Sequence, residues 1–112
     1  DLLSEHIETK QHLPQNLLKA LLDARFFQSG MQTLRQIEFA LFDLSIHKHN
    51  PALNAAQVQA TLDDIRQKYA VAPTASYNRF QHSFSHIFAG GYAAGYYSYK
   101  WAEVLASDAF DR

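Results

Sequence analysis

The sequence contains no cysteine, which excludes disulfide bonds, thiolate metal ligands and a cysteine nucleophile. It has no apolar run near the roughly 20 residues that a membrane span requires. Its formal net charge is −1 and its basic residues are scattered, whereas a nucleic-acid binder carries a basic stripe or patch. We therefore expect neither a membrane nor a nucleic acid as a partner. The lack of cysteine and of a signal-peptide pattern favours a cytoplasmic location.

Enough apolar residues are present to build a packed core. Hydrophobic residues make up 47% of the 112 residues, which is ordinary for a globular protein, and the length suits one domain. No stretch shows the strict alternation of a strand, and no repeat or low-complexity tract occurs. The sequence therefore predicts an all-α fold.

In the first half of the chain, apolar residues recur at helical spacing. The pattern runs to about Thr9 and, after Pro14, from Gln15 to Ile46, which predicts a short helix followed by one long helix. Gly30 is expected to mark a kink or a close helix contact. The long helix is expected to pack along a seam that steps by three and four residues: Phe27, Gly30, Leu34, Ile37, Leu41 and Leu44.

The second half contains two further helical patterns. Asn54 and Gln57 match a capping box at the start of a third helix, which should end near Tyr69. Residues 76–91 are irregular and rich in aromatic residues and histidine. A last helix is expected from about Tyr92.

Both ends of the chain stop within helical patterns. The pattern starts at Leu2 without a lead-in, and residues 108–112 contain no glycine or proline that would stop a helix. We interpret the chain as excised from a longer protein. Its apolar surface would then be covered by the remainder of that protein or by self-association.

Three tyrosines form the most informative pattern in the sequence. Because each helical residue advances by about 100°, Tyr92, Tyr96 and Tyr99 are expected to project from one narrow face. The opposite face is apolar and comprises Tyr97, Trp101, Val104 and Leu105. A row of hydroxyl donors can bind peptide carbonyls and stabilise an oxyanion. Tyrosines at this spacing are, however, more often half-buried packing residues.

Two glycines precede the first of these tyrosines. Gly90 and Gly91 permit backbone conformations that are closed to other residues, so a ligand backbone can approach them closely.

One peptidase family has a tyrosine motif in the same order. This order is His86, Gly90-Gly91-Tyr92, Tyr96-Tyr97, Tyr99 and Trp101-Ala102-Glu103. It resembles the C-terminal motif of the thimet oligopeptidase and oligopeptidase A family of zinc metallopeptidases. Residues 34–43 are similar to the long-helix segment of the same family, and residues 84–97 are closest to its bacterial oligopeptidase A branch. The resemblance covers nearly the whole chain.

The resemblance implies a zinc metalloendopeptidase that is mostly helical, has two lobes and hydrolyses short peptides. In that family an HExxH helix and a glutamate of a following helix hold the zinc ion, and both precede the segment similar to this chain. No HExxH occurs here. We therefore expect residues 1–112 to form one helical segment of the C-terminal part of the catalytic domain. The zinc ligands would lie in the remainder of the parent enzyme, and the isolated chain would be inactive and free of metal.

The resemblance also implies roles for individual residues. Tyr99 matches the tyrosine that hydrogen-bonds the scissile carbonyl in the transition state, and Tyr92 and Tyr96 match tyrosines that assist in the same site. His86 matches the histidine that contacts the substrate backbone. The predicted roles are catalytic for Tyr99 and Tyr92 and substrate-binding for His86, Tyr96, Gly90 and Gly91.

Two other functions stay open on the sequence alone. The seam from Phe27 to Leu44 would suit a helical protein-interaction module without catalysis. His82 and His86 are four residues apart and on one helix face could bind a metal ion, although no third ligand is evident. The pair His47 and His49 lies at a helix end, where histidine suits the helix dipole.

The remaining charged residues receive simpler interpretations. Arg35, Glu38 and Asp43 share the long helix and are expected to be solvated or to make contacts between lobes. Glu103 either orients a phenol or is a surface charge.

Overall fold

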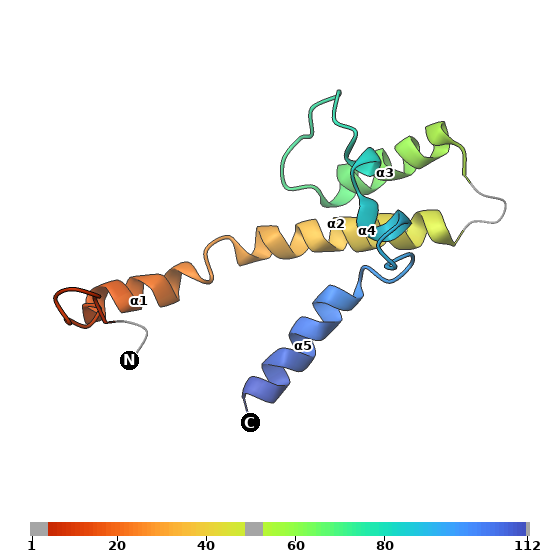
Figure 1. Cartoon of the computed structure of the whole chain (residues 1–112). Coiled ribbons are helices and arrows are strands. Elements are labelled where there is room, and N and C mark those ends of the chain that lie inside the picture. The colour runs from red at the N-terminus through yellow and green to blue at the C-terminus, as the bar shows by residue number, and fades with distance from the viewer. Residues whose placement is uncertain (1–4, 49–52, 112) are drawn as a thin grey trace. The chain divides into compact units, whose positions relative to one another are not determined.

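A computed structural model of the chain describes residues 5–48 and 53–111, and all its regular elements are helical (Figure 1). These elements are α1 (Gln15–Ala24), α2 (Ser29–His47), α3 (Ala55–Tyr69), the 3₁₀ turn η2 (Phe80–His82), α4 (Ser85–Phe88) and α5 (Ser98–Phe110). The predicted all-α fold is thus confirmed. Every helix in the described ranges is too short or too polar to span a bilayer. The chain divides into two compact units, one up to Gly30 and one from Met31.

Residues 5–14 form a closed loop. The His6 N–H donates to the Gln11 carbonyl oxygen over 2.9 Å, which brings two parts of the loop together. The predicted helix up to Thr9 is therefore wrong over the described part of that segment, because the chain turns back on itself there. The beginning of the predicted helix, residues 1–4, lies outside the described residues.

A break separates α1 from α2, so the prediction of one helix over Gln15–Ile46 is wrong. Residues 25–28 form turns in which backbone N–H groups bond to carbonyls three residues earlier, as in a 3₁₀ helix. Gln28 has a left-handed φ of 54°, which an α-helix does not accommodate. Gly30 is not the break: it lies within α2, and a Cβ added there would meet nothing within 4 Å.

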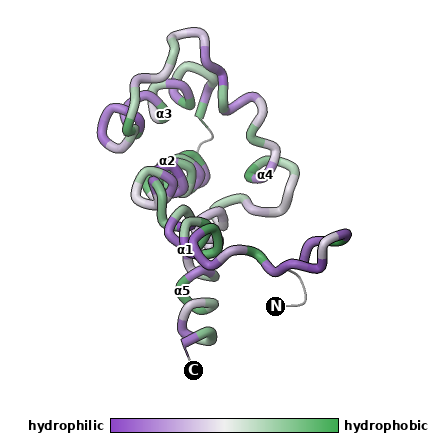
Figure 2. The backbone as a smooth tube through the Cα atoms, turned by 90° about the vertical axis from the view of Figure 1, so that its left-hand side faces the viewer, coloured by the Kyte–Doolittle hydropathy of each residue, from purple (hydrophilic) through white to green (hydrophobic). Residues whose placement is uncertain are grey.

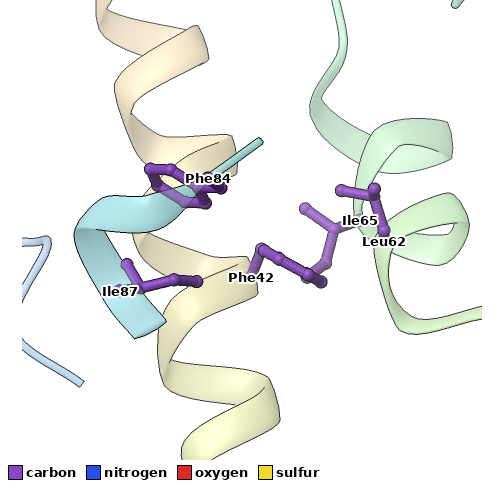
Figure 3. Packing of buried hydrophobic residues seen from close by; sticks show 5 residues of the cluster. All are labelled: Phe42, Leu62, Ile65, Phe84 and Ile87. Atoms are coloured by element: carbon purple, nitrogen blue, oxygen red, sulfur yellow. The ribbon is translucent and has the colours of Figure 1, made fainter. Parts of the chain in front are cut away.

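The core of the second unit joins α2, α3 and α4. Phe42 of α2 lies between Leu62 and Ile65 of α3 on one side and Ile87 of α4 on the other (Figure 3). Phe84, which precedes α4, closes the cluster, and all five side chains are buried. Burying each such side chain contributes about 1.5–3 kcal/mol. The packing therefore fixes α2 and α4 next to each other.

The buried face of α2 differs from the predicted seam. Leu41 packs against the core, but Leu34 and Leu44 are 38% and 39% exposed, and Phe27 before the helix is 70% exposed. The buried positions of α2 include two acidic residues, which an apolar pattern cannot reveal: Glu38, Ala40, Phe42 and Asp43.

The start of α3 follows the predicted capping box. The Gln57 N–H donates to Asn54 Oδ1 over 3.0 Å, and the Asn54 N–H donates to Gln57 Oε1 over 2.9 Å. These bonds satisfy two backbone donors that the helix itself leaves free. The predicted end at Tyr69 is also confirmed. The predicted helix break after Ile46 agrees with the end of α2 at His47, and residues 49–52 lie outside the described residues.

Two helices expose much of their apolar surface. Neither α1 nor α5 buries a residue within the part of the chain that the structure describes. Hydrophobic stretches recur along both helices in Figure 2. The exposed apolar side chains are Leu17, Leu18, Leu21 and Leu22 on α1, and Trp101, Val104, Leu105 and Phe110 on α5.

Candidate functional site

The segment between α4 and α5 carries the predicted site. His86 lies on α4, and residues 93–97 form consecutive turns before α5 begins at Ser98. The prediction of a helix from Tyr92 is therefore wrong about its start. Ala94 explains this difference, because its φ of 54° is left-handed and interrupts a right-handed helix.

The two glycines shape the chain directly after α4. A Cβ added at Gly90 would lie 2.8 Å from the Cα and carbonyl oxygen of His86, closer than real atoms approach. Gly91 has a φ of 80°, which glycine adopts without steric cost. Both positions thus need glycine for the backbone path, and their contact with substrate stays a prediction.

Asp43 of α2 holds the turns at 93–97 in place. Its Oδ1 accepts the Ala94 N–H over 2.8 Å, and its Oδ2 accepts the Tyr96 N–H over 2.9 Å. The carboxylate is fully buried. His47 Nδ1 lies 2.8 Å from the same Oδ1 and 2.9 Å from the Asp43 carbonyl oxygen. The expectation that Asp43 is solvated or bridges two lobes is therefore wrong.

The structure brings the predicted tyrosines together around His86. The rings of Tyr92 and Tyr99 are stacked with centroids 5.1 Å apart, and those of Tyr96 and Tyr99 are 5.0 Å apart. The His86 ring lies 6.4 Å from Tyr92 and 6.1 Å from Tyr96. We call these four rings the tyrosine cluster. They meet through the turns, since only Tyr99 belongs to α5. Tyr97 is 51% exposed and, within the described chain, makes none of these ring contacts.

Two hydroxyls of the cluster hold their protons more firmly than a free tyrosine does. A hydrogen bond with the Tyr92 hydroxyl raises the pKa of Tyr99, and burial and the neighbouring phenols of Tyr92 and Tyr96 add to the effect. Burial raises the pKa of Tyr96. Because the ordinary value is about 10, both hydroxyls are neutral at pH 7 and can donate hydrogen bonds.

The cluster rests on aromatic residues of the core. The Tyr96 ring meets Phe84 edge-on at 4.9 Å and Phe39 at 5.9 Å between centroids. Phe39 in turn stacks on Phe80 at 4.6 Å. Such pairs add to the stabilisation from burial alone. Tyr96 therefore anchors the phenols to α2 and to the segment before α4.

Glu38 forms a second buried carboxylate on α2. Arg66 Nε of α3 donates to Glu38 Oε1 over 2.9 Å, and Arg66 Nη1 donates to Asn78 Oδ1 over 3.3 Å. The expectation that Glu38 is solvated or bridges two lobes is wrong, since it is 3% exposed and ties α2 to α3. Arg35 is exposed and lies over the Phe39 ring at 4.8 Å.

The sequence carried a signal for both buried carboxylates. Leu34, Leu41 and Phe42 lie three or four positions from Glu38, and Phe39, Ala40 and Ile46 lie three or four positions from Asp43, so each carboxylate shares a helix face with apolar residues. An acidic residue within the apolar part of an amphipathic helix is costly to bury without a partner, so such a position predicts one. That rule would have identified Asp43, although it would not have identified the backbone of residues 93–97 as its partner.

The described residues do not fit a zinc site. In that part of the chain, no three His, Asp or Glu side chains gather closely enough to hold a metal ion. His82 and His86 lie on separate elements, η2 and α4, so they do not share the helix face that the alternative metal site requires. Glu103 pairs with Lys100. Since protein zinc sites use three or four ligands, these side chains supply no such set.

Comparison with known proteins gives several relatives that carry the same name, oligopeptidase A. Oligopeptidase A of Escherichia coli strain K12 is 51% identical over 110 residues, covering 98% of this chain and 16% of that protein. The probable cytosolic oligopeptidase A of Arabidopsis thaliana is 48% identical over 108 residues, covering 96% and 15%. The organellar (chloroplastic/mitochondrial) oligopeptidase A of the same plant is 47% identical over 108 residues, covering 96% and 14%.

The chain thus spans about 16% of the length of the E. coli relative that it matches. The profile of Peptidase family M3 matches residues 1–112, which is every residue of the chain. The chain therefore belongs to peptidase family M3.

Proposed function

We propose that this chain is a segment of a zinc oligopeptidase and supplies groups that bind a short peptide and stabilise the transition state of its hydrolysis. The observation that carries this proposal is the convergence of three phenols and His86 in the tyrosine cluster. Relatives named oligopeptidase A support the choice of substrate class.

Tyr99 is the donor to the developing oxyanion in this proposal. Hydrolysis of a peptide passes through a tetrahedral intermediate with a negatively charged oxygen, and positioned donors lower the barrier. The neighbouring Tyr92 hydroxyl raises the pKa of Tyr99, so the Tyr99 hydroxyl keeps its proton at neutral pH and can donate a hydrogen bond to the oxyanion. Because the Tyr99 side chain is 39% exposed, its hydroxyl can turn from Tyr92 to a substrate.

The other residues of the site bind and orient the peptide. Tyr92 assists Tyr99 by holding its hydroxyl in the resting enzyme, and the half-buried Tyr96 supports both rings. His86 is exposed beside them and offers ring nitrogens to the peptide backbone. Gly90 and Gly91 allow the backbone path beside His86, and a Cβ position at Gly91 has no atom within 4 Å, which leaves room for an extended peptide.

The zinc ion belongs to the remainder of the peptidase in this proposal. The described residues provide no ligand set, and the chain matches only about a sixth of its relatives' length. We place the segment in the C-terminal part of the catalytic domain. The isolated chain is then inactive and binds no zinc stoichiometrically.

The exposed apolar faces of α1 and α5 are docking surfaces for that remainder. Isolated soluble domains rarely leave contiguous apolar patches of this kind uncovered. The short match relative to the relatives' length supports the remainder of the same protein as the occupant. We place the complete peptidase in the cytoplasm, as the absence of cysteine favours and as the name of one plant relative states for that protein.

A segment exchange tests the proposal. Residues 1–112 replace the matched segment of E. coli oligopeptidase A, and hydrolysis of a fluorogenic peptide is measured together with zinc content and melting temperature. We expect activity from the exchanged enzyme and its loss when Tyr92, Tyr96 and Tyr99 are all changed to phenylalanine. A folded, zinc-loaded enzyme that is unaffected by the triple change contradicts the proposal. An inactive exchange combined with a discrete oligomer of the isolated chain would favour the interaction module.

A further inference from the structure

The shape of the tyrosine cluster depends on a residue outside it. Ala94 and Tyr96 lie on either side of Gly95, and their N–H groups each donate to one carboxylate oxygen of Asp43, over 2.8 and 2.9 Å. A carboxylate is the side chain suited to this task, since both of its oxygens accept hydrogen bonds and neither donates. Asp43 thus fixes two points of a segment whose own backbone bonds are those of turns, such as the bond from the Gly95 N–H to the Tyr92 carbonyl oxygen over 2.8 Å.

The backbone conformation of Ala94 in this turn is intrinsically unfavourable. Ala94 has a φ of 54°, and this left-handed region disfavours a residue with a Cβ. The Ala94 N–H is also one of the two groups that Asp43 binds. The carboxylate therefore stabilises the turn at its strained residue, and the direction in which the Tyr92, Tyr96 and Tyr99 rings leave the backbone depends on that turn.

Asp43 reaches the turn from a buried position on α2. Asp43 is fully buried and lies next to Phe42 in the chain, at the centre of the core. His47 adds a third partner to the carboxylate, since its Nδ1 lies 2.8 Å from Oδ1. The carboxylate is thereby fixed from both sides, from its own helix and from the turn.

We propose that Asp43 is a positioning residue for peptide hydrolysis: it holds the turn at residues 93–97 so that Tyr92 and Tyr99 present their hydroxyls in register with the substrate. This inference rests on the proposed function of the tyrosine cluster. Asp43 does not touch the substrate, since it is buried beneath the turn. It acts through the backbone of Ala94 and Tyr96.

The test uses Asp43→Asn in the complete peptidase, meaning the longer protein of which we propose that this chain is a segment. Asparagine has the same shape, but its amide group turns one acceptor into a donor that faces a backbone N–H. One of the two bonds to the turn is then lost. We expect kcat to fall by about 100-fold with little change in KM, because misplacing a reacting group by about 1 Å costs that much. The assay is steady-state hydrolysis of a fluorogenic peptide.

Glu38→Gln is the matched control. It also changes a buried carboxylate of α2 into an amide, but it faces Arg66 of α3 and not the turn. If Asp43 were merely structural, the two variants would lose melting temperature alike and keep their kcat per folded, zinc-loaded molecule alike. A kcat of Asp43→Asn that equals that of Glu38→Gln on this basis overturns the proposal.

A spectroscopic readout adds a measure that loss of stability does not move. The contact between the Tyr92 and Tyr99 hydroxyls raises the pKa of Tyr99, so a displaced turn should return the Tyr99 titration toward the ordinary tyrosine value. Isotope labelling of tyrosine and NMR titration would show this change in Asp43→Asn and not in Glu38→Gln. An unchanged Tyr99 titration in Asp43→Asn overturns the proposal.

Two further variants separate the possible failures. If Asp43→Asn does not fold, His47→Ala tests the positioning role instead. It removes one partner of the Asp43 carboxylate and leaves the Ala94 and Tyr96 N–H donors in place. We expect a several-fold fall in kcat, and an unchanged kcat would count against positioning. Tyr99→Phe reports on the proposed function itself. If Tyr99→Phe lowers kcat and Asp43→Asn does not, only the positioning role fails; if Tyr99→Phe has no effect, the proposed function fails.

Discussion

Two carboxylates on one helix show how differently a buried charge can be used. Glu38 and Asp43 are 3% and 0% exposed and five positions apart on α2. Glu38 meets the charged side chain of Arg66, 28 positions along the chain, and joins two helices. Asp43 meets backbone N–H groups 51 and 53 positions away and fixes the path of a non-helical segment. The ion pair therefore maintains the packing, whereas the carboxylate on backbone donors shapes the proposed site.

Breaking the ion pair should give the largest effect on stability. Removing one member of a buried pair leaves the other charge uncompensated, which costs about 3–5 kcal/mol. We expect Glu38→Gln to lower the free energy of unfolding by about that amount, measured by urea unfolding of the complete peptidase. The kcat per folded molecule should stay near that of the unmodified enzyme. A variant that keeps its stability would show that Arg66 finds another partner, and the comparison between the two carboxylates would fail.

The next largest effect is expected in the proposed site, which Asp43 contacts and Glu38 does not. Tyr99→Phe removes one hydroxyl and keeps the ring, so the stack on Tyr92 is preserved. Loss of one oxyanion donor costs on the order of 100- to 1,000-fold in kcat, with KM nearly unchanged if the bond forms mainly in the transition state. Steady-state kinetics with a fluorogenic peptide, at equal zinc content, measures both constants. Tyr92→Phe should act in the same direction with a smaller effect.

Tyr97→Phe is the control for that prediction. Tyr97 neighbours the cluster in sequence, but its side chain is 51% exposed and makes none of the cluster's ring contacts among the described residues. We expect its kcat to be near that of the unmodified enzyme. Equal losses for Tyr99→Phe and Tyr97→Phe, or a change confined to KM, would show that the cluster does not stabilise the transition state.

A smaller effect should come from the backbone next to His86. In Gly90→Ala, the new Cβ would meet the His86 backbone at 2.8 Å, so the segment must shift, at a cost of about 1–3 kcal/mol. In Gly95→Ala, the new Cβ would lie 3.4 Å from its nearest neighbour, the Tyr92 carbonyl oxygen, so little needs to move. We expect Gly90→Ala to lower both melting temperature and kcat and Gly95→Ala to change them less. The reverse order would contradict the path described for residues 89–92.

The sequence predicted the helical class and the local signals well. The capping box of Asn54 and Gln57 is a short-range interaction, and it identified the start of α3 correctly. The end of α2 at His47 was likewise marked by polar residues and a proline in the sequence. Such features depend on neighbours in the chain, so a pattern of a few residues suffices to find them.

Features set by distant contacts were missed. The tyrosines were predicted to share a face of one helix, yet Tyr92 and Tyr96 precede α5 and meet Tyr99 through the turns. Asp43, more than 50 positions earlier, bonds to these turns, and spacing alone cannot reveal that contact. The grouping of the phenols was therefore predicted from the wrong geometry. The break at residues 25–28 was missed because the apolar pattern runs through it without interruption.

The smallest effect is a shift in the titration of Tyr99, and it tests the contact that Asp43 is proposed to maintain. The Tyr92 hydroxyl is the largest cause of the raised pKa of Tyr99, ahead of burial. Tyr92→Phe should therefore lower the pKa of Tyr99 toward the ordinary value of about 10. Because the pKa of Tyr99 is higher in the folded than in the unfolded protein, Tyr99 contributes its full stabilisation at a pH below the ordinary tyrosine pKa. This stabilisation is lost as the pH rises through the raised pKa. Tyr92→Phe should therefore narrow the pH interval over which the stabilisation is lost.

NMR titration of labelled tyrosine, with Tyr99→Phe used to assign the signal, measures the shift. Tyr77→Phe is the matched control, since Tyr77 is 84% exposed and lies before η2, away from the cluster in sequence. It should leave the Tyr99 titration where it was. If Tyr92→Phe also leaves the Tyr99 titration unchanged, the Tyr92 and Tyr99 hydroxyls are not hydrogen-bonded in the resting protein. The substrate would then replace no hydrogen bond between Tyr92 and Tyr99 when it binds, and Tyr92 would assist only through its stacked ring.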